Sequence, residues 1–245
     1  MIVTADRLDR YWADELGCLP EALFQGGVSL YAPPHREGPR WMGWLIPLAC
    51  VRLERALPGA GVVSITPAQF PALSALLGQG GVDVLPPHGE GFAPFIRRHF
   101  PHSSTRVDRI LRCDAGTFTP APAVFPVSQL EASDAQFNWY RLHFDGPIFV
   151  ARDERERIIS WAAIKCKSDM IWEMAVVTDA GYRNRGLARS VVSRATQAAL
   201  DTGRIPMYLH DIANTASSRV CRALGYQPYG YQLSCECGRV TPSKR

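Results

Sequence analysis

Apolar and polar residues alternate with two different periods along this chain of 245 residues, and the clearer pattern lies in its second half. Residues 172–177 there are nearly all apolar, as in a strand that is covered on both faces. Apolar positions then repeat with helical spacing from residue 189 to residue 202, before a glycine. A strand followed by a helix predicts an α/β protein.

The first half of the chain carries shorter elements of mixed type. Residues 5–16 place four apolar side chains on one helix face, and residues 62–65 read as a short strand. Residues 67–77 predict a helix, whereas residues 41–52 fit either a strand or a buried helix segment. We therefore expect a smaller α/β domain before the clearer one. The four apolar residues of the first helix are Leu8, Tyr11, Trp12 and Leu16.

A stretch rich in Pro, Ala and Thr separates the two halves. It holds three prolines within seven positions, which exclude a helix and favour an extended connector. We accordingly expect an N-terminal domain at residues 1–116, a connector at 117–127 and a second domain at 128–245.

The sequence Tyr182–Ala188 predicts an anion site. A strand of apolar residues precedes it and a helix follows, so that free backbone N–H groups converge at the start of the helix. Gly186 allows the backbone to approach an anion closely, and Ala188 adds little bulk. Three arginines surround the same point with positive charge, which suits a pyrophosphate. They are Arg183, Arg185 and Arg189.

The spacing Arg-x-x-Gly-x-Ala, from Arg183 to Ala188, resembles the acyl-CoA pyrophosphate loop of the GNAT superfamily of N-acetyltransferases. Asn214 at the start of a later helix and the ending Leu-Gly-Tyr at residues 224–226 are similar to a second signature of that family. The resemblance covers residues 125–235 and implies a GNAT-like acyltransferase domain, an α/β fold with a mixed sheet, that uses acetyl-CoA as acyl donor. The apolar runs at residues 149–154, 158–164, 172–177 and 206–210 look like four successive strands of that fold. A degenerate second copy of this fold, shaping the acceptor site, is one alternative for the N-terminal half.

The resemblance also implies which residues hold the cofactor. The strand before the loop would meet the pantetheine arm, and the loop would meet the pyrophosphate. A backbone N–H near Met174 would stabilise the oxyanion. The implied cofactor contacts are Ala175, Val176, Val177, Arg183, Asn184, Arg185, Gly186, Leu187, Ala188, Arg189, Asn214 and Ser217.

Three side chains are candidates for the chemistry. Glu173 is the carboxylate of an otherwise apolar strand and, if buried without a cation, suits a general base or a substrate contact. The alternatives are that it points to an edge or pairs with an Arg. His210 could relay a proton or cap a strand end. Many family members carry a tyrosine, as the acid for the leaving thiolate, where this chain has Cys221. Cys221 could donate that proton or pack in the core, and Tyr226, Tyr229 or Tyr231 could substitute.

Four aromatic residues are candidates for contact with the acceptor, and core packing is their alternative role. We expect a small-molecule amine as acceptor, such as an amino sugar, antibiotic or amino acid. Protein lysine or N-terminal acetylation and a non-catalytic CoA-binding module remain alternatives. The four residues are Trp139, Tyr140, His143 and Trp172.

Charge and apolar runs change this picture little. The net charge of +4 fits an anionic cofactor, although the basic stretch 97–112 leaves nucleic acid open as a partner. The longest apolar run, 41–51, is about half a membrane span. Cys235-x-Cys237 and His99-x-x-His102 lack further ligands at suitable spacing, so we expect no metal. We expect a cytoplasmic monomer or homodimer.

Overall fold

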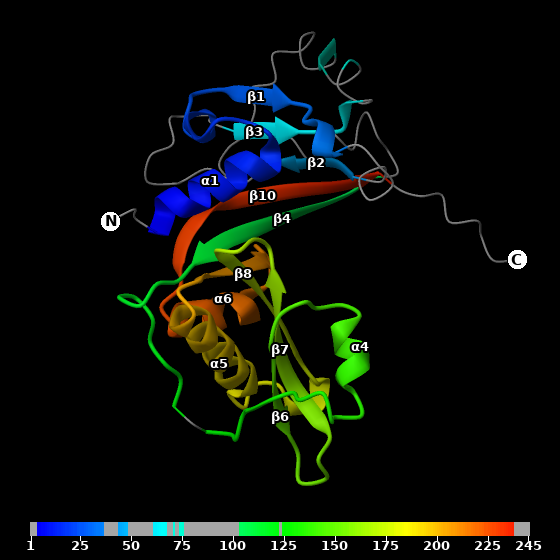
Figure 1. Cartoon of the computed structure of the whole chain (residues 1–245), viewed down its shortest axis with the longest axis vertical. Coiled ribbons are helices and arrows are strands. Elements are labelled where there is room, and N and C mark those ends of the chain that lie inside the picture. Colours follow the sequence, from blue (N-terminus) through cyan, green and yellow to red (C-terminus); the bar gives the residue numbers. More distant parts are fainter. Residues whose placement is uncertain are drawn as a thin grey trace, which may run out of the picture. The chain divides into compact units, whose positions relative to one another are not determined.

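The computed structural model describes residues 4–36, 44–48, 61–67, 71, 74–75, 103–122 and 124–237, and the chain divides into two compact units (Figure 1). The first unit comprises Met1–Ile110 and Tyr229–Arg245, and the second comprises Leu111–Pro228. The division thus does not follow the order of the chain, because the C-terminal segment belongs with the N-terminal one. The expected connector at 117–127 lies inside the second unit.

The first unit combines helix α1 (Thr4–Leu16) with strands. The predicted helix face is confirmed, since all four of its apolar side chains are buried. Parallel pairing joins β1 to β3, and antiparallel pairing joins β2 to both β3 and β10. Two short 3-10 turns, Pro20–Leu23 and Pro34–Arg36, complete the unit. The strands are neighbours in the order β1 (Val28–Tyr31), β3 (Gly61–Ser64), β2 (Trp44–Leu48), β10 (Gln227–Cys237) and β4 (Ser103–Arg112). The first two residues of β10 and the last two of β4 belong to the second unit.

The second unit is a mixed sheet with helices on both faces. Strands β8 and β9 run parallel, and the other neighbours pair antiparallel. All four apolar runs predicted as strands are confirmed, as are both helices of this region. The strand order is β9 (Ile205–Asp211), β8 (Ile171–Thr178), β7 (Ile158–Cys166), β6 (Ile148–Arg152) and β5 (Ser128–Gln129). The helices are α4 (Phe137–Arg141), the 3-10 turn η4 (Ala180–Tyr182), α5 (Leu187–Asp201) and α6 (Thr215–Ala223).

Side-chain alternation explains why both faces of this sheet are covered. Ala162 and Ile164 of β7 pack in the core that α5 closes, whereas Ala163 between them packs with Tyr140 of α4. Figure 1 shows α4 and α5 on opposite sides of β7. A residue of β7 or β8 therefore faces either the α5 side or the α4 side according to its place in the alternation.

Strands β8 and β9 pair over only part of their length. Their register runs from Ile171 opposite Ile205 to Met174 opposite Tyr208. Beyond this pair β8 continues to Thr178 and β9 to Asp211 without further pairing between them. The strands therefore part after Met174, toward the end of β8 from which the chain turns into α5.

The structure also decides an open expectation from the sequence. Residues 44–48, within the ambiguous run 41–52, form a strand. Part of the basic stretch 97–112, residues 103–112, also forms a strand. Most of the helix expected at 67–77 lies outside the described residues, as do His99 and His102. Within the described part of the chain, no helix is both long enough and apolar enough to cross a membrane.

Candidate functional site

A cleft of about 480 Å³ opens where β8 and β9 part. Its walls come from the end of β8, the turn before α5, the first turns of α5 and α6, and one residue of β9. All of these belong to the second unit. The lining residues are Val176, Val177, Thr178, Tyr182, Arg183, Asn184, Gly186, Leu187, Ala188, Arg189, Tyr208, Asn214, Ala216, Ser217, Arg219 and Val220.

The first turn of α5 supplies one end of the cleft. Gly186 occupies the N-cap position with φ 84°, and no side chain caps this end of the helix. An added Cβ at Gly186 would meet nothing within 4 Å, so the left-handed backbone angle, rather than crowding, is the reason for glycine here. The uncapped N–H groups of this turn therefore point into open space, and the helix dipole favours an anion there.

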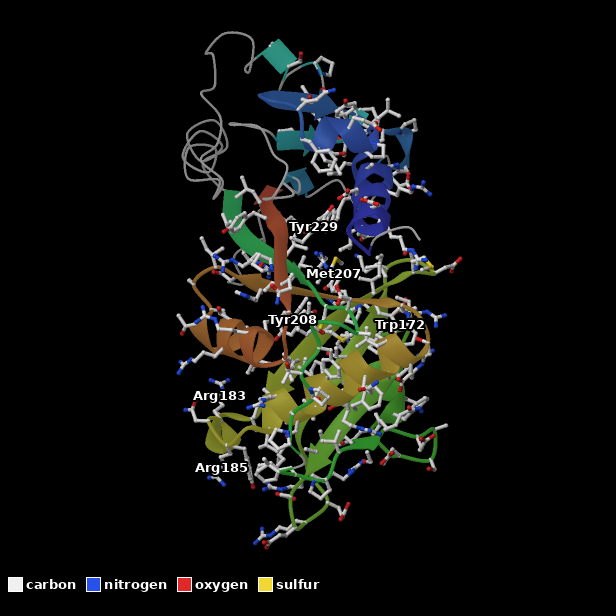
Figure 2. The ribbon with its side chains drawn as sticks, turned by 90° about the vertical axis from the view of Figure 1, so that its left-hand side faces the viewer. Trp172, Arg183, Arg185, Met207, Tyr208 and Tyr229 are labelled. Atoms are coloured by element: carbon white, nitrogen blue, oxygen red, sulfur yellow. The ribbon has the colours of Figure 1, made fainter. Side chains whose placement is uncertain are left out.

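The three arginines near the first turn of α5 make different contacts. Arg189 lines the cleft, and its Nε is buried without a hydrogen-bond partner among the described residues. Arg183 also lines the cleft and donates through Nε to the Thr178 carbonyl at 3.3 Å. Arg185 lies outside the lining: it donates to the Gly181 carbonyl and stacks on Tyr182. Figure 2 shows Arg183 and Arg185 on the turn that leads into α5.

The start of α6 forms the facing wall. Asn214 caps this helix, because its Oδ1 accepts a hydrogen bond from the Ser217 N–H at 3.0 Å. Both residues also line the cleft, so the capping role and a ligand-facing position hold together. Two N-termini, those of α5 and α6, thus border the same space.

The end of β8 forms the floor between these walls. Val176 and Val177 line the cleft, and Val177 is 45% exposed, while Ala175 is not part of the lining. The Ser160 hydroxyl of β7 holds this strand end, donating to the Val177 carbonyl at 3.1 Å and lying 2.7 Å from the Thr178 hydroxyl. The end of β8 is therefore held in place by β7, and its backbone does not pair with β9 there, so an extended ligand can lie along it.

Glu173 lies on the other face of β8. It is opposite Lys165 in the register with β7, and its Oε1 accepts from Lys165 Nζ at 3.1 Å, with Lys167 Nζ 4.0 Å from Oε2. The carboxylate is therefore half-buried with two cations, and the condition of burial without a cation is not met. Its neighbour Met174 packs on the α5 side. Glu173 thus faces away from the cleft, on the side that carries α4.

His210 and Asp211 end β9, as expected. The His210 ring is buried, its Nδ1 lies 2.8 Å from the Asp211 carbonyl oxygen, and its Nε2 has no partner among the described residues. The ring does not line the cleft, although its centroid is 6.3 Å from that of Tyr208, which does.

Cys221 is enclosed in the core. It is fully buried beside Tyr208 and Tyr226, and burial raises the pKa of its thiol far above the usual value. It does not line the cleft. Core packing is therefore the role that its position supports.

The three tyrosines after Cys221 are engaged elsewhere. The Tyr226 hydroxyl lies 2.7 Å from the Thr196 hydroxyl of α5 in the core. Tyr229 donates to Asp9, and Tyr231 accepts from Arg109, both within the first unit. None of the three lines the cleft.

Tyr208 is a residue of the cleft that sequence reasoning missed. Its ring is 2% exposed and lines the cleft, and its hydroxyl makes no hydrogen bond among the described residues. Burial raises the pKa of the phenol well above 10; nearby Cys221 adds to the rise and the Ser217 hydroxyl offsets part of it. The sequence offered one signal, an aromatic residue with a polar tip inside the run Pro206–His210.

The expected acceptor residues do not line the cleft. Trp139 is 53% exposed on α4 and packs against Tyr140 and His143, whose ring is 4.8 Å away. Tyr140 is buried against the α4 face of the sheet. Trp172 is buried on the α5 side, beneath the Arg204 guanidinium at 4.6 Å.

Residues 135–232 match the sequence model of the GNAT acetyltransferase family. No curated protein matches the chain. The chain is also similar to solved structures, and the three described next have TM-scores below 0.5.

Three of these structures come from bacteria. A GNAT-family protein from Novosphingobium aromaticivorans is 16% identical over 72% of this chain and 84% of its own, with a TM-score of 0.48. A GCN5-related N-acetyltransferase from Sphaerobacter thermophilus is 12% identical over 72% and 71%, with a TM-score of 0.47. A GCN5-related N-acetyltransferase-like protein from Streptococcus suis is 17% identical over 60% and 68%, with a TM-score of 0.45.

The family match spans the strands that part, the uncapped turn of α5 and the start of α6, which together build the cleft. The chain therefore contains a GNAT acetyltransferase domain at residues 135–232.

Proposed function

We infer that the protein transfers an acetyl group from acetyl-CoA directly to a primary amine of a small molecule. The observation that carries this proposal is the cleft itself: an uncapped helix N-terminus and a buried, unpartnered Arg189 Nε border one end, and unpaired β8 backbone borders the floor. A pyrophosphate satisfies the first pair of features, and an extended thioester arm satisfies the last.

The anionic end of the cofactor binds at α5. The N–H groups that follow Gly186 donate to phosphate oxygens, and Arg183 and Arg189 supply positive charge. Asn214 and Ser217 of α6 border the same space and contribute polar side chains. The adenosine and pantetheine parts then leave this point in opposite directions.

The pantetheine arm lies along Val177 and Val176 toward the point where β8 and β9 part. There the backbone N–H groups after Met174 are free of β9 and donate to the carbonyl oxygen as negative charge develops on it. Loss of one such donor raises a reaction barrier by about 3 kcal/mol in comparable enzymes.

The amine approaches from the α4 face of the sheet. Glu173 lies on this face, and we assign it the role of accepting the ammonium proton, directly or through water. Its Oε1 accepts a hydrogen bond from Lys165, which fixes the position of the carboxylate on this face. Cys221 has no part in this mechanism because it is enclosed in the core.

Two rival functions have less support. The arginines of the described part of the basic stretch pair with neighbours: Arg106 with Asp108, Arg112 with Asp114, and Arg109 with the Tyr231 hydroxyl. Their charges are thus partly compensated, which weakens a role in nucleic-acid binding. A non-catalytic CoA-binding module would keep the cleft but yield no product.

One experiment separates these functions. Acetyl-CoA is titrated into the protein by calorimetry, and the protein is then incubated with acetyl-CoA and a panel of amino sugars, amino acids and lysine peptides. We expect binding, release of free CoA, and an acetylated amine detected by mass spectrometry. Binding without product across the panel would favour the module, and product from the peptides alone would favour protein acetylation.

A further inference from the structure

The chain lacks a tyrosine at position 221, yet it places a phenol in the cleft from another element. Tyr208 projects from β9, opposite Met174 in the last pair before the strands part. Its hydroxyl is buried and has no hydrogen-bond partner among the described residues. A buried unpaired hydroxyl costs free energy, so its place at a ligand cleft calls for a ligand atom as partner.

The surroundings of Tyr208 explain how the strand residue reaches this position. Its ring packs in the same core as the fully buried Cys221 and lies 5.7 Å, centroid to centroid, from the ring of Tyr226. Cysteine at 221 is small, so the space beside the start of α6 is left to the ring from β9. Figure 2 shows Tyr208 between α5 and α6.

We propose that the Tyr208 hydroxyl donates a hydrogen bond, and then its proton, to the sulfur of the leaving CoA thiolate. This assignment rests on the proposed function, because it requires the thioester arm to run along Val177 and Val176 to the apex of the cleft. At that apex Tyr208 supplies a buried hydroxyl that has no hydrogen-bond partner among the described residues.

The step balances without a further reactant. The amine nitrogen bonds to the thioester carbon, and the carbon–sulfur bond breaks with its electron pair going to sulfur. Tyr208 Oη passes its proton to sulfur. The nitrogen, which has already given its ammonium proton to Glu173, releases a second proton as the amide forms, and that second proton restores the phenol. The products are an amide and free CoA thiol.

Burial keeps the phenol protonated, because desolvation raises its pKa well above 10. The hydroxyl therefore carries a proton that it can share with the sulfur. The other titratable groups near the phenol are Cys221, Tyr226 and His210.

The test compares Tyr208→Phe with Tyr226→Phe in the full chain. Tyr226 is the matched control, because it is a buried tyrosine of the same core whose hydroxyl pairs with Thr196 away from the cleft. Free CoA is bound to each protein, and thiolate formation is followed by ultraviolet absorbance against pH. The same protein with acetyl-CoA, which has no free thiol, is the blank.

We expect the pKa of the bound CoA thiol to be higher in Tyr208→Phe by about one unit, a tenfold loss of thiolate at a given pH. The control should leave it unchanged. Turnover should fall about 10- to 100-fold in Tyr208→Phe, with the Kd for acetyl-CoA within roughly twofold of wild type. The Tm should fall in Tyr226→Phe and not in Tyr208→Phe, since only the former loses a hydrogen bond.

An unchanged thiol pKa in Tyr208→Phe, with CoA bound, would overturn the role of Tyr208 and leave the proposed function intact. Absence of CoA binding to the wild-type protein would instead overturn the proposed function and this inference together.

Discussion

Met174 and Tyr208 face each other in the last paired position of β8 and β9, and the cleft begins there. This one pair sets the site, because it fixes where the backbone of β8 loses its partner and where the Tyr208 ring enters. Four residues further along β8, Thr178 leads into the turn that carries Arg183 and Gly186. A short segment thus joins the point where β8 and β9 part to the turn before α5.

Gly186→Glu should abolish detectable acetyl-CoA binding. The substitution places a negative side chain at the uncapped helix N-terminus and strains a backbone with φ 84°. Gly203→Glu is the matched control: Gly203 has φ 72°, open space around it, and lies just beyond the other end of α5. Calorimetry should show normal affinity in the control, and equal affinity in both variants would refute the phosphate site.

Arg189→Ala should weaken acetyl-CoA binding about 10- to 100-fold. The change removes a charge-assisted hydrogen bond to phosphate and breaks no described hydrogen bond of the Nε atom. Arg194→Ala, an exposed position on the same helix, serves as control. Acetyl-pantetheine, which has no pyrophosphate, should bind equally to all three proteins. A loss of affinity for it in Arg189→Ala would show that the effect is structural.

Glu173→Gln should lower kcat about 100-fold or more and leave the Kd for acetyl-CoA unchanged, since the carboxylate faces away from the cofactor cleft. The substitution also removes the ion pair with Lys165, which is 44% exposed and therefore contributes little stability. Lys165→Met removes the same pair but keeps the carboxylate. Steady-state kinetics that show equal losses in both variants would argue for the pair rather than the base.

Gly225→Ala should destabilise the protein by at least about 2 kcal/mol. Gly225 has φ 81° after α6, and an added Cβ would lie 1.8 Å from the Thr117 carbonyl oxygen, which belongs to the backbone and cannot move aside cheaply. Gly203→Ala has a similar φ with open space, so it isolates the cost of the backbone angle. Urea unfolding should show a larger loss for Gly225→Ala, and equal losses would exclude the steric term.

Asp153 should make the stability of the β6–β7 hairpin depend on pH in the acid range. Hydrogen bonds from Arg157, Tyr182 and the backbone N–H of Arg155 surround its carboxylate, and chiefly those from Arg157 lower its pKa to about 2. A depressed folded-state pKa adds stability above the unfolded value, near 4, which is lost as the pH falls through about 2.

The measurement is urea unfolding of wild type and Asp153→Asn between neutral pH and pH 2. The difference in stability should be constant above about pH 5 and should shrink as the pH falls. In an Arg157→Gln background, Asp153→Asn should cost less, because the main partner is already absent. A difference that stayed constant down to pH 2 would contradict the assignment.

Much of the second unit could be predicted because its signals are local. The buried face of α5 can be predicted from the sequence, because its apolar residues recur at helical spacing, as in Leu187, Val191 and Ala195. The turn at Gly186 requires a positive φ, which the glycine marks directly. Asn214 caps α6 through a residue only three positions away.

The remaining features depend on residues far apart in the chain. No local sequence pattern predicts the contact between Lys165 and Glu173, because it depends on the register of β7 against β8. The same holds for the chain division, in which β10 pairs with β2 and its segment Tyr229–Arg245 joins the N-terminal unit. The connector expected from three prolines is bound within the second unit by hydrogen bonds, such as that from Thr119 N to Leu224 O.

The sequence by itself determined the elements of the second unit and the glycine turn before α5, since short-range periodicity and backbone conformation specify both. Only the tertiary structure decided that Tyr208 lines the cleft while Tyr226 pairs with Thr196. Packing and register, rather than residue type, decide which hydroxyl finds a partner among the described residues and which does not.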